Sequence, residues 1–170
     1  SDGVNNVLDG GGGADTLDGG TGDDFASYAD NSAGVTVHLD GTAGSGGSAA
    51  GDILRNIEGL IGGSGDDSLV GDTTANTLSG GDGDDVLYGG AGTDVFHFGA
   101  NQGYNVIHDF SIHDWDLIDL NTGSTAAITA SETADGNLLL STNHGTQVES
   151  VGVDVDEWKD GWVRWNCLLY

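Results

Sequence analysis

The strongest constraint on this sequence is a nine-residue repeat rich in glycine and aspartate. Its copies form two blocks: GGGGADTLD from Gly10 and GGTGDDFAS from Gly19, then GGSGDDSLV from Gly62, GDTTANTLS from Gly71, GGDGDDVLY from Gly80 and GGAGTDVFH from Gly89. The first nine residues, SDGVNNVLD, follow the same register in degraded form. A fixed period of this kind predicts a solenoid in which each copy is one structural unit that stacks on others.

Each repeat divides into a turn and a strand. The first six residues form the turn, because glycine tolerates positive φ angles and lets carbonyl oxygens converge. The last three residues form a short strand whose middle residue points inward. The expected core residues are Leu17, Ala26, Leu69, Leu78, Leu87 and Phe96. Two repeats make one coil, so repeats i and i+2 stack. The predicted fold is all-β: a right-handed parallel β-roll of nonapeptide repeats.

The sixth position of the turn carries Asp or Asn in most copies, and this pattern indicates a metal site. A carboxylate beside converging carbonyl oxygens suits Ca²⁺, which takes six to eight oxygen ligands at about 2.3–2.6 Å. A flexible Gly/Ser linker would give the apolar residues no fixed phase, whereas here one recurs two places after the Asp or Asn. Cys167 is the single cysteine, so a bound metal is the expected staple in place of an internal disulfide. Several Ca²⁺ ions are therefore the predicted cofactor.

Charge and hydropathy limit the partners. With Lys+Arg 3 and Asp+Glu 28, the formal net charge is −25. Nucleic acid and anionic membrane surfaces are themselves negative and are poor partners for such a chain. No apolar run approaches the roughly 20 residues of a membrane span.

The repeats resemble those of the RTX, or hemolysin-type, family of calcium-binding proteins. Residues 56–61 (NIEGLI), running into GGSGDD, resemble the link between RTX blocks, and Asp109 with residues 116–120 resembles the family's C-terminal boundary. Residues from about 128 to 155 resemble the antiparallel cap that closes RTX arrays in serralysin-type proteases and other type I-secreted proteins. The resemblance implies a bacterial extracellular protein whose export partner is a type I secretion apparatus.

The resemblance also implies a ligand set in which each of two stacked turns gives its position-six side chain and two backbone carbonyls. Carried onto this chain, the implied sites are Gly63, Gly65 and Asp67 with Gly80, Asp82 and Asp85; Asp72, Thr74 and Asn76 with Gly89, Ala91 and Asp94; and Asp2, Val4 and Asn6 with Gly19, Thr21 and Asp24. Asn6 and Asn76 keep an oxygen but lose a charge, so their sites are expected to be weaker.

Other candidate ligands form half-sites. Gly11, Gly13 and Asp15 need a stacked partner after Tyr28. Gly81, Gly83 and Asp85 need one between residues 99 and 105, where Asn105 is the candidate. The remaining candidate ligands are Gly90, Gly92, Asp109 and Asp116.

The domain organisation follows from where the period lapses. Between about residues 28 and 61 we expect longer coils within one continuous roll over 1–105. A flexible joint between two short rolls is the alternative, but each short block would leave an end of its core exposed. Residues 106–170 are expected to form the C-terminal cap, with a hairpin turn at 143–146. The helically spaced Trp158, Trp162 and Trp165 are expected to pack in the cap or to belong to an export signal.

No catalytic constellation is present in the sequence. The five histidines (His38, His97, His108, His113 and His144) do not form HExxH, and no GxSxG motif occurs. We therefore expect a non-enzymatic stretch, although the parent protein can be an enzyme. The leading interpretation is a calcium-binding domain of a secreted protein that folds outside the cell and supports type I secretion and the stability of its parent. The alternative is a substrate-binding or adhesive module of a secreted protease, alginate epimerase, ice-binding protein or cell-surface adhesin, with a glycan or surface ligand.

Overall fold

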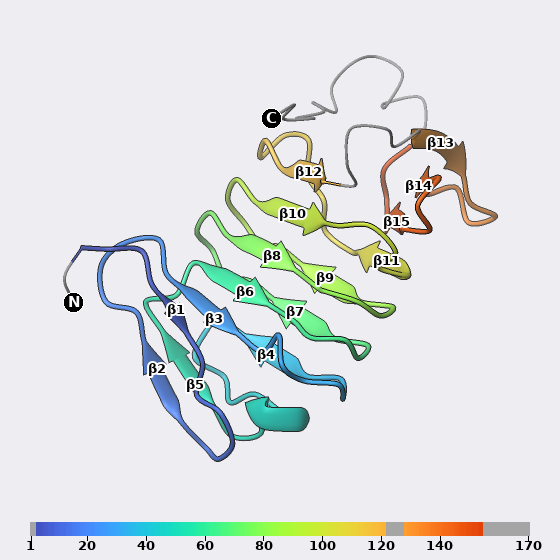
Figure 1. Cartoon of the computed structure of the whole chain (residues 1–170). Coiled ribbons are helices and arrows are strands. Elements are labelled where there is room, and N and C mark those ends of the chain that lie inside the picture. The colour runs from blue at the N-terminus through green and yellow to red at the C-terminus, as the bar shows by residue number, and fades with distance from the viewer. Residues whose placement is uncertain (1–2, 122–127, 155–170) are drawn as a thin grey trace.

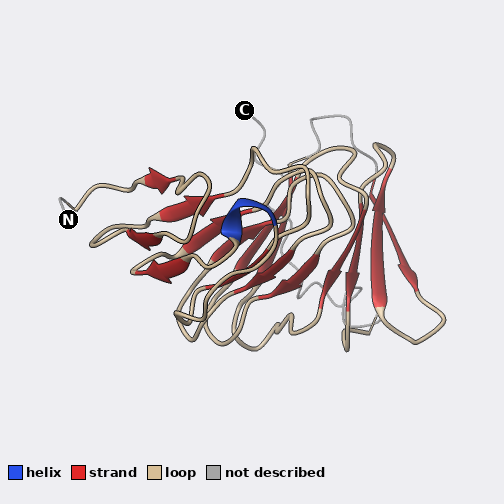
Figure 2. Cartoon of the chain, turned by 90° about the horizontal axis from the view of Figure 1, so that it is seen from below, coloured by secondary structure: helices blue, strands red, loops and turns tan. Residues whose placement is uncertain are grey.

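Short strands and turns alternate along a coil that stacks upon itself (Figure 1). The computed structural model describes residues 3–121 and 128–154. The strands are β1 (Val7–Leu8), β2 (Thr16–Asp18), β3 (Phe25–Ser27), β4 (Thr36–His38), β5 (Ile53–Arg55), β6 (Gly59–Ile61), β7 (Ser68–Val70), β8 (Thr77–Ser79), β9 (Val86–Tyr88), β10 (Val95–Phe98), β11 (Tyr104–Ile107), β12 (Leu117–Leu120), β13 (Ile128–Glu132), β14 (Leu138–Thr142) and β15 (Gln147–Ser150). A single turn of 3₁₀ helix, η1, spans Gly47–Ala49 and is the short helix of Figure 2.

Strands of alternate repeats pair in parallel. One sheet has the order β1-β3-β6-β8-β10-β12, and every pair in it is parallel. The second sheet contains β11-β9-β7-β4 in parallel, and β2 and β5 form a small third sheet. In the repeats, Leu69 pairs with Leu87 and Leu78 with Phe96. Repeat i therefore stacks on repeat i+2, which confirms the parallel β-roll predicted from the sequence.

The first sheet passes through the irregular segment without a break. β3 pairs directly with β6, with Ala26 opposite Leu60, although the two strands are separated by most of that segment. The intervening chain first adds β4 to the second sheet beside β7. It then turns through η1 and places β5 beside β2. The longer coils of residues 28–61 thus lie within one stack of strands.

The parallel stack also continues past residue 105, where the sequence analysis placed its end. β11 pairs with β9, and β12 pairs with β10 through to Leu120. The turns before these two strands lack the Gly-Gly pair, so the nine-residue period slips in the sequence. Asn105 and Asp116 still occupy the places that Asp85 and Asp94 hold in the preceding coils.

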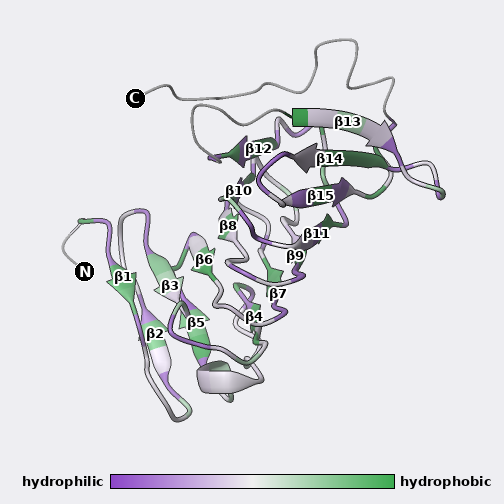
Figure 3. Ribbon diagram, turned by 45° about the vertical axis from the view of Figure 1, so that its right-hand side comes forward, coloured by the Kyte–Doolittle hydropathy of each residue, from purple (hydrophilic) through white to green (hydrophobic). Residues whose placement is uncertain are grey.

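Each three-residue strand contributes one fully buried side chain at most to the apolar core, whereas the four-residue strands β10 and β12 bury two each. The six residues expected to point inward are all buried, together with their counterparts Leu54, Leu60, Ile107 and Ile118 in the irregular and terminal coils. In Figure 3 the hydrophobic segments lie on strands such as β4, β5 and β6, while the turns are mostly hydrophilic. One fully inward side chain per short strand gives a small apolar core for a chain of this length, so other interactions have to hold the coils together.

Glycine is required where stacked turns touch. Gly81 and Gly83 have φ angles of 98° and 119°, in the region that disfavours residues with a Cβ. A Cβ on Gly81 would lie 2.1 Å from the carbonyl oxygen of Gly63, and one on Gly83 would lie 2.5 Å from that of Gly65. The GGxG pattern thus reflects both the backbone conformation and the close approach of successive coils.

The cap extends the second sheet. β13, β14 and β15 are antiparallel to one another, and β15 joins the roll by pairing in parallel with β11. The hairpin between β14 and β15 spans residues 143–146, as expected, and Leu138, Leu140 and Val148 are buried. Within the described residues, no helix is long and apolar enough to cross a membrane. Trp158, Trp162, Trp165 and Cys167 lie outside the described residues.

Replacing Gly83 by Ala tests the close approach of the turns. A Cβ there meets both an unfavourable φ angle and the Gly65 carbonyl, so we expect a loss of stability of more than ~1–2 kcal/mol, the penalty of the left-handed backbone alone. Thermal unfolding in saturating Ca²⁺ measures it. Gly12→Ala is the matched control, because a Cβ on Gly12 meets nothing within 4 Å. Equal melting temperatures for the two variants would contradict this account.

Candidate metal centre

Most turns of the roll end in an Asp or Asn whose side chain is buried. Asp24, Asp67, Asn76, Asp85, Asp94 and Asn105 are each at most 2% exposed. Asp and Asn are among the residues most often found at protein surfaces, and a buried charge is unfavourable unless it is paired. These side chains belong to the sixth position of the turns, so the roll holds a row of them along each of its two long edges.

The first ladder consists of Val35, Asp67 and Asp85, which precede β4, β7 and β9, and of Asn105, the second residue of β11. The N–H of Val35 donates to Asp67 Oδ1 at 2.8 Å, and the N–H of Asp67 donates to Asp85 Oδ1 at 2.9 Å. The N–H of Asp85 donates to Asn105 Oδ1 at 3.2 Å. Each side chain thus accepts from the equivalent backbone position of the preceding coil. Asp67 and Asp85 are brought together as the sequence implied, and Asn105 completes the half-site of Asp85.

The second ladder consists of Asn6, Asp24, Glu58, Asn76, Asp94 and Asp116, which precede β1, β3, β6, β8, β10 and β12. The bonds run from Asn6 N to Asp24 Oδ1 (2.7 Å), Asp24 N to Glu58 Oε2 (2.8 Å), Asn76 N to Asp94 Oδ1 (2.8 Å) and Asp94 N to Asp116 Oδ1 (2.9 Å). Between Glu58 and Asn76 the amide Nδ2 of Asn76 instead approaches the Glu58 carbonyl oxygen at 3.5 Å.

The half-site of Asp15 finds its partner in Asp52, at the end of the turn before β5. The N–H of Asp15 donates to Asp52 Oδ1 at 2.8 Å, and the hydroxyl of Tyr28 donates to Asp52 Oδ2 at 3.2 Å. Burial raises the pKa of the Tyr28 hydroxyl, helped by the Asp52 carboxylate, so the phenol stays a donor. Asp52 is therefore served by two protein donors.

Four position-six carboxylates keep one oxygen without a partner. The Oδ2 atoms of Asp15, Asp24, Asp85 and Asp94 are buried and make no hydrogen bond to the described protein. Arg55 is the single Lys or Arg in the described part of the chain, and it forms no ion pair with a described carboxylate. Buried carboxylate oxygens that lack both a donor and a basic partner fit a bound cation, and an all-oxygen environment fits a hard one such as Ca²⁺.

Backbone carbonyls also approach position-six oxygens that already accept a hydrogen bond: Asp67 Oδ2 accepts from Gly63 N at 2.7 Å, and Asn76 Oδ1 accepts from Asp72 N at 2.8 Å. A Cβ on Gly62 would lie 2.1 Å from the Gly80 carbonyl oxygen and 2.3 Å from Asp67 Oδ2. On Gly71 it would lie 2.2 Å from the Gly89 carbonyl oxygen and 2.4 Å from Asn76 Oδ1. A carbonyl of the following coil and a position-six oxygen therefore flank each of these first-position glycines, and both belong to the ligand sets implied by the sequence.

Other predicted carbonyl ligands face the stacked turn as well. The Val4 and Thr74 carbonyls lie against Gly22 and Gly92. The carbonyls of Gly63 and Asp72 accept from Asp82 N at 2.9 Å and Ala91 N at 3.1 Å. The N–H of Gly11 donates to Asp9 Oδ1 at 2.8 Å, and Gly13 (φ 137°) and Thr21 lie in the exposed parts of their turns. Asp2 lies outside the described residues.

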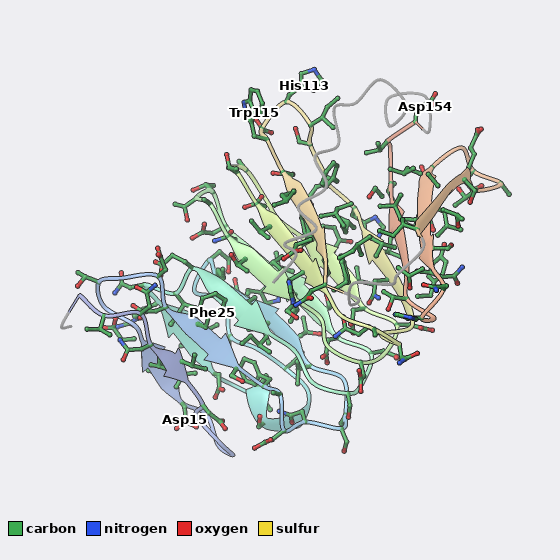
Figure 4. All side chains as sticks on the ribbon, turned by 45° about the horizontal axis from the view of Figure 1, so that its top comes forward. Asp15, Phe25, His113, Trp115 and Asp154 are labelled. Carbon is green, nitrogen blue, oxygen red and sulfur yellow. The ribbon has the colours of Figure 1, made fainter. Side chains whose placement is uncertain are left out.

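Asp109 acts differently from the other candidates. Its Oδ1 and Oδ2 accept from the N–H groups of Gly89 and Gly90, both at 2.9 Å, so its carboxylate closes the last repeat turn through hydrogen bonds. The following turn ends in Asp116 and presents Trp115, 66% exposed, at its tip beside His113 (Figure 4).

Side chains alone do not assemble a metal site. Within residues 3–121 and 128–154, no group of three or more His, Cys, Asp and Glu side chains is placed to hold an ion. Two of the histidines have structural contacts instead: His97 Nδ1 lies 3.0 Å from Asp119 Oδ2, and the ring of His108 stacks on Tyr88. A site in these turns therefore depends on backbone carbonyls as well as on the position-six side chains.

Burial makes these carboxyl groups weak acids in the ion-free protein. It raises the pKa of Asp85 to about 7 and that of Asp94 to about 6, with nearby carboxylates adding to the effect. Burial also raises the pKa values of Asp67 and Asp116. When these buried carboxyl groups are ionised, the surrounding protein does not fully stabilise their negative charge.

The comparison with protein families identifies the repeats. The model of the RTX calcium-binding nonapeptide repeat matches four copies, over residues 3–26 and 61–96. These stretches are RTX calcium-binding repeats. The matched residues include the repeat turns of both ladders and leave out the segment from 27 to 60.

Two solved structures align with most of this chain. The extracellular lipase LipA from Serratia marcescens is 20% identical over 90% of the chain, with a TM-score of 0.49, and the chain spans 37% of the lipase. The AlgE6R3 subunit of the Azotobacter vinelandii mannuronan C5-epimerase is also 20% identical over 90% of the chain, with a TM-score of 0.33 and 76% of that subunit covered. No curated protein matches the sequence.

The raised pKa values predict how the ion-free RTX roll responds to pH. The folded state binds protons at Asp85 and Asp94 more tightly than the unfolded chain, whose Asp groups titrate near 3.8. These two groups therefore favour folding at low pH, and their contribution is lost as the pH rises from about 4 to about 7. In EGTA, circular dichroism should show more strand at pH 5 than at pH 8.

Calcium binding should show the opposite dependence. Protons compete with Ca²⁺ for the same carboxylates, so the Ca²⁺ concentration at half-folding should be higher at pH 5 than at pH 7. Asp85→Asn should weaken both effects. A response to pH that is the same in Asp85→Asn as in the natural sequence would contradict the assignment to these buried groups.

Proposed function

We propose that this chain is a calcium-dependent folding domain of a secreted protein, in which Ca²⁺ binds between stacked RTX turns and thereby joins coil i to coil i+2. The observation that carries the proposal is the set of buried position-six carboxylate oxygens without a donor or basic partner. Asp67 and Asp85, with the Gly80 carbonyl beside them, would hold one such ion. Asn76 and Asp94, with the Gly89 carbonyl, would hold another.

Charge balance explains why folding would require the ion. Without Ca²⁺, stacked carboxylates repel one another in a roll that has only a small apolar core. Bound Ca²⁺ supplies two positive charges at each site and satisfies the unpartnered oxygens. Because the site exists only when both turns are in place, binding and folding become one event.

The proposal extends to localisation. Extracellular modules bind calcium at about 10⁻⁴–10⁻³ M, so such a domain would stay unfolded at the low calcium of a cytoplasm and fold outside the cell. The RTX repeats and the extracellular lipase among the similar structures support this setting. We propose export through a type I apparatus, and a role in ion binding and stability of the parent protein and not in catalysis.

Circular dichroism with Asp85→Asn tests calcium-dependent folding. The natural chain should lack strand signal in EGTA at pH 8 and gain it in millimolar Ca²⁺. Asp85 takes part in two successive hydrogen bonds of the first ladder. A hydrogen bond to a charged group contributes about 1.5–3 kcal/mol, so the Ca²⁺ concentration at the folding midpoint should rise by roughly tenfold or more in the variant. Asp30→Asn, at an exposed site outside the ladders, is the control and should not change the midpoint. A full strand spectrum in EGTA would refute the proposal.

Export can be measured separately. In a bacterium that carries a type I apparatus, the parent protein should reach a calcium-containing medium folded, with its RTX domain resistant to protease. Secretion that is unaffected when the apparatus is deleted would refute the export route while leaving the calcium site intact.

A further inference from the structure

One RTX turn stacks on a segment that is not a repeat. The turn of residues 19–24 lies against the corner between β5 and β6. The N–H of Gly19 donates to the Arg55 carbonyl at 3.1 Å, and the N–H groups of Glu58 and Gly59 both donate to the Asp24 carbonyl at 2.9 Å. This corner falls in the gap between the two stretches matched by the RTX repeat.

The corner is shorter than a repeat turn. Arg55 ends β5 and Gly59 begins β6, so only residues 56–58 separate the strands. Asn56 turns the chain with a φ of 50°, a left-handed conformation that Asn adopts more readily than most residues. Its side-chain Nδ2 donates to Asp18 Oδ1 at 2.7 Å, which fixes the corner against the end of β2.

The oxygens around Gly19 reproduce the arrangement found in the repeats. A Cβ on Gly19 would lie 2.3 Å from the Asn56 carbonyl oxygen and 2.7 Å from Asp24 Oδ2. Gly62 and Gly71 each have the same two neighbours, a carbonyl of the following coil and the position-six oxygen of their own turn. The Asn56 carbonyl therefore takes the place of the Gly80 and Gly89 carbonyls, near enough to Asp24 Oδ2 for one cation with ligands at about 2.3–2.6 Å to touch both.

Glu58 supplies the second carboxylate. Its Oε2 accepts from Asp24 N at 2.8 Å, as Asp85 Oδ1 accepts from Asp67 N and Asp94 Oδ1 from Asn76 N. The side chain of Glu58 is one methylene longer than that of aspartate. From a corner of only three residues it therefore reaches the backbone N–H that a position-six Asp accepts from in the repeats.

An unsatisfied buried atom points independently to a ligand. Asp24 is 0% exposed. Its Oδ1 accepts from the backbone and side-chain nitrogens of Asn6, while its Oδ2 has no hydrogen-bond partner in the described protein. The atom without a partner is the one that lies beside the Asn56 carbonyl oxygen across Gly19.

We propose that a Ca²⁺ ion binds between turn 19–24 and corner 56–58, held by the carboxylates of Asp24 and Glu58 and by the carbonyl oxygen of Asn56. This site rests on the proposed calcium-binding function and adds a ligand set outside the repeats. The ion would link the last part of the irregular segment, residues 56–58, to the first repeat block. The second ladder thereby binds an ion at a step where the sequence has no repeat.

Calcium stoichiometry tests the site. Native mass spectrometry and equilibrium dialysis at saturating Ca²⁺ should show one ion fewer for Glu58→Gln than for the natural chain, because Gln keeps the hydrogen bond from Asp24 but removes the charge. Glu132→Gln, an exposed glutamate of β13, is the matched control and should lose none. Asp85→Asn should weaken binding in the first ladder.

The outcomes separate this site from the general function. If the natural chain neither binds calcium nor folds with it, the proposed function fails and this site fails with it. If calcium folds the chain and Asp85→Asn weakens binding, while Glu58→Gln keeps every ion at unchanged affinity, only the corner site is refuted.

A measurement on the natural chain decides the case in which Glu58→Gln does not fold. The sequence contains four glutamates, so ¹³C labelling of their carboxyl carbons gives a spectrum that variants can assign. At constant pH, the carboxyl-carbon resonance of Glu58 should move as Ca²⁺ is bound, because the ion contacts that carboxylate, whereas the resonance of the exposed Glu132 should stay in place. A Glu58 resonance that does not respond to Ca²⁺ while the chain folds would overturn the site.

Discussion

Successive coils of the roll lie so close that the residue at the end of most turns is wholly or partly buried between them. At that position the chain places Asp, Asn or Glu, whose one oxygen accepts the backbone N–H of the coil before it. This bond fixes the register of the stack, but it leaves several second oxygens buried without a partner. The described part of the chain offers one basic side chain and no ion pair to these groups, and in the proposed function bound Ca²⁺ balances their charge.

The same spacing explains the composition of the repeat. Carbonyl oxygens of one turn lie where a Cβ of the next would stand, so glycine at these places is a packing requirement as much as a conformational one. The strands can then be short, because each needs only one inward side chain. The resulting core of Leu69, Leu78, Leu87 and their neighbours is continuous but thin. Cross-links between turns therefore matter more here than in a domain with a wide core.

The irregular segment shows how a repeat array tolerates an insertion. The first sheet stays unbroken because β3 pairs with β6, while the extra residues build β4, η1 and the small β2–β5 sheet. Two residues of this segment stack on the first repeat block. Asp52 accepts from Asp15 N and from the Tyr28 hydroxyl, and Glu58 accepts from Asp24 N.

The roll, its core and the main stacked pairs follow from the sequence alone. The nine-residue spacing and the place of the apolar residue within it recur from copy to copy, so they can be read without knowing the tertiary structure. The sequence predicted that Asp67 would meet Asp85 and that Asn76 would meet Asp94, and it named Asn105 for the coil after Asp85. Tertiary structure decided where the period fails. Asp52 and Glu58 precede apolar strand residues just as a position-six Asp does, but loops of unequal length separate them from Asp15 and Asp24, so no fixed spacing reveals those partners. The sequence also did not reveal that the roll extends to Leu120. The turns before β11 and β12 lack the Gly-Gly pair of the repeat, and only the pairing of these strands with β9 and β10 shows that the register continues.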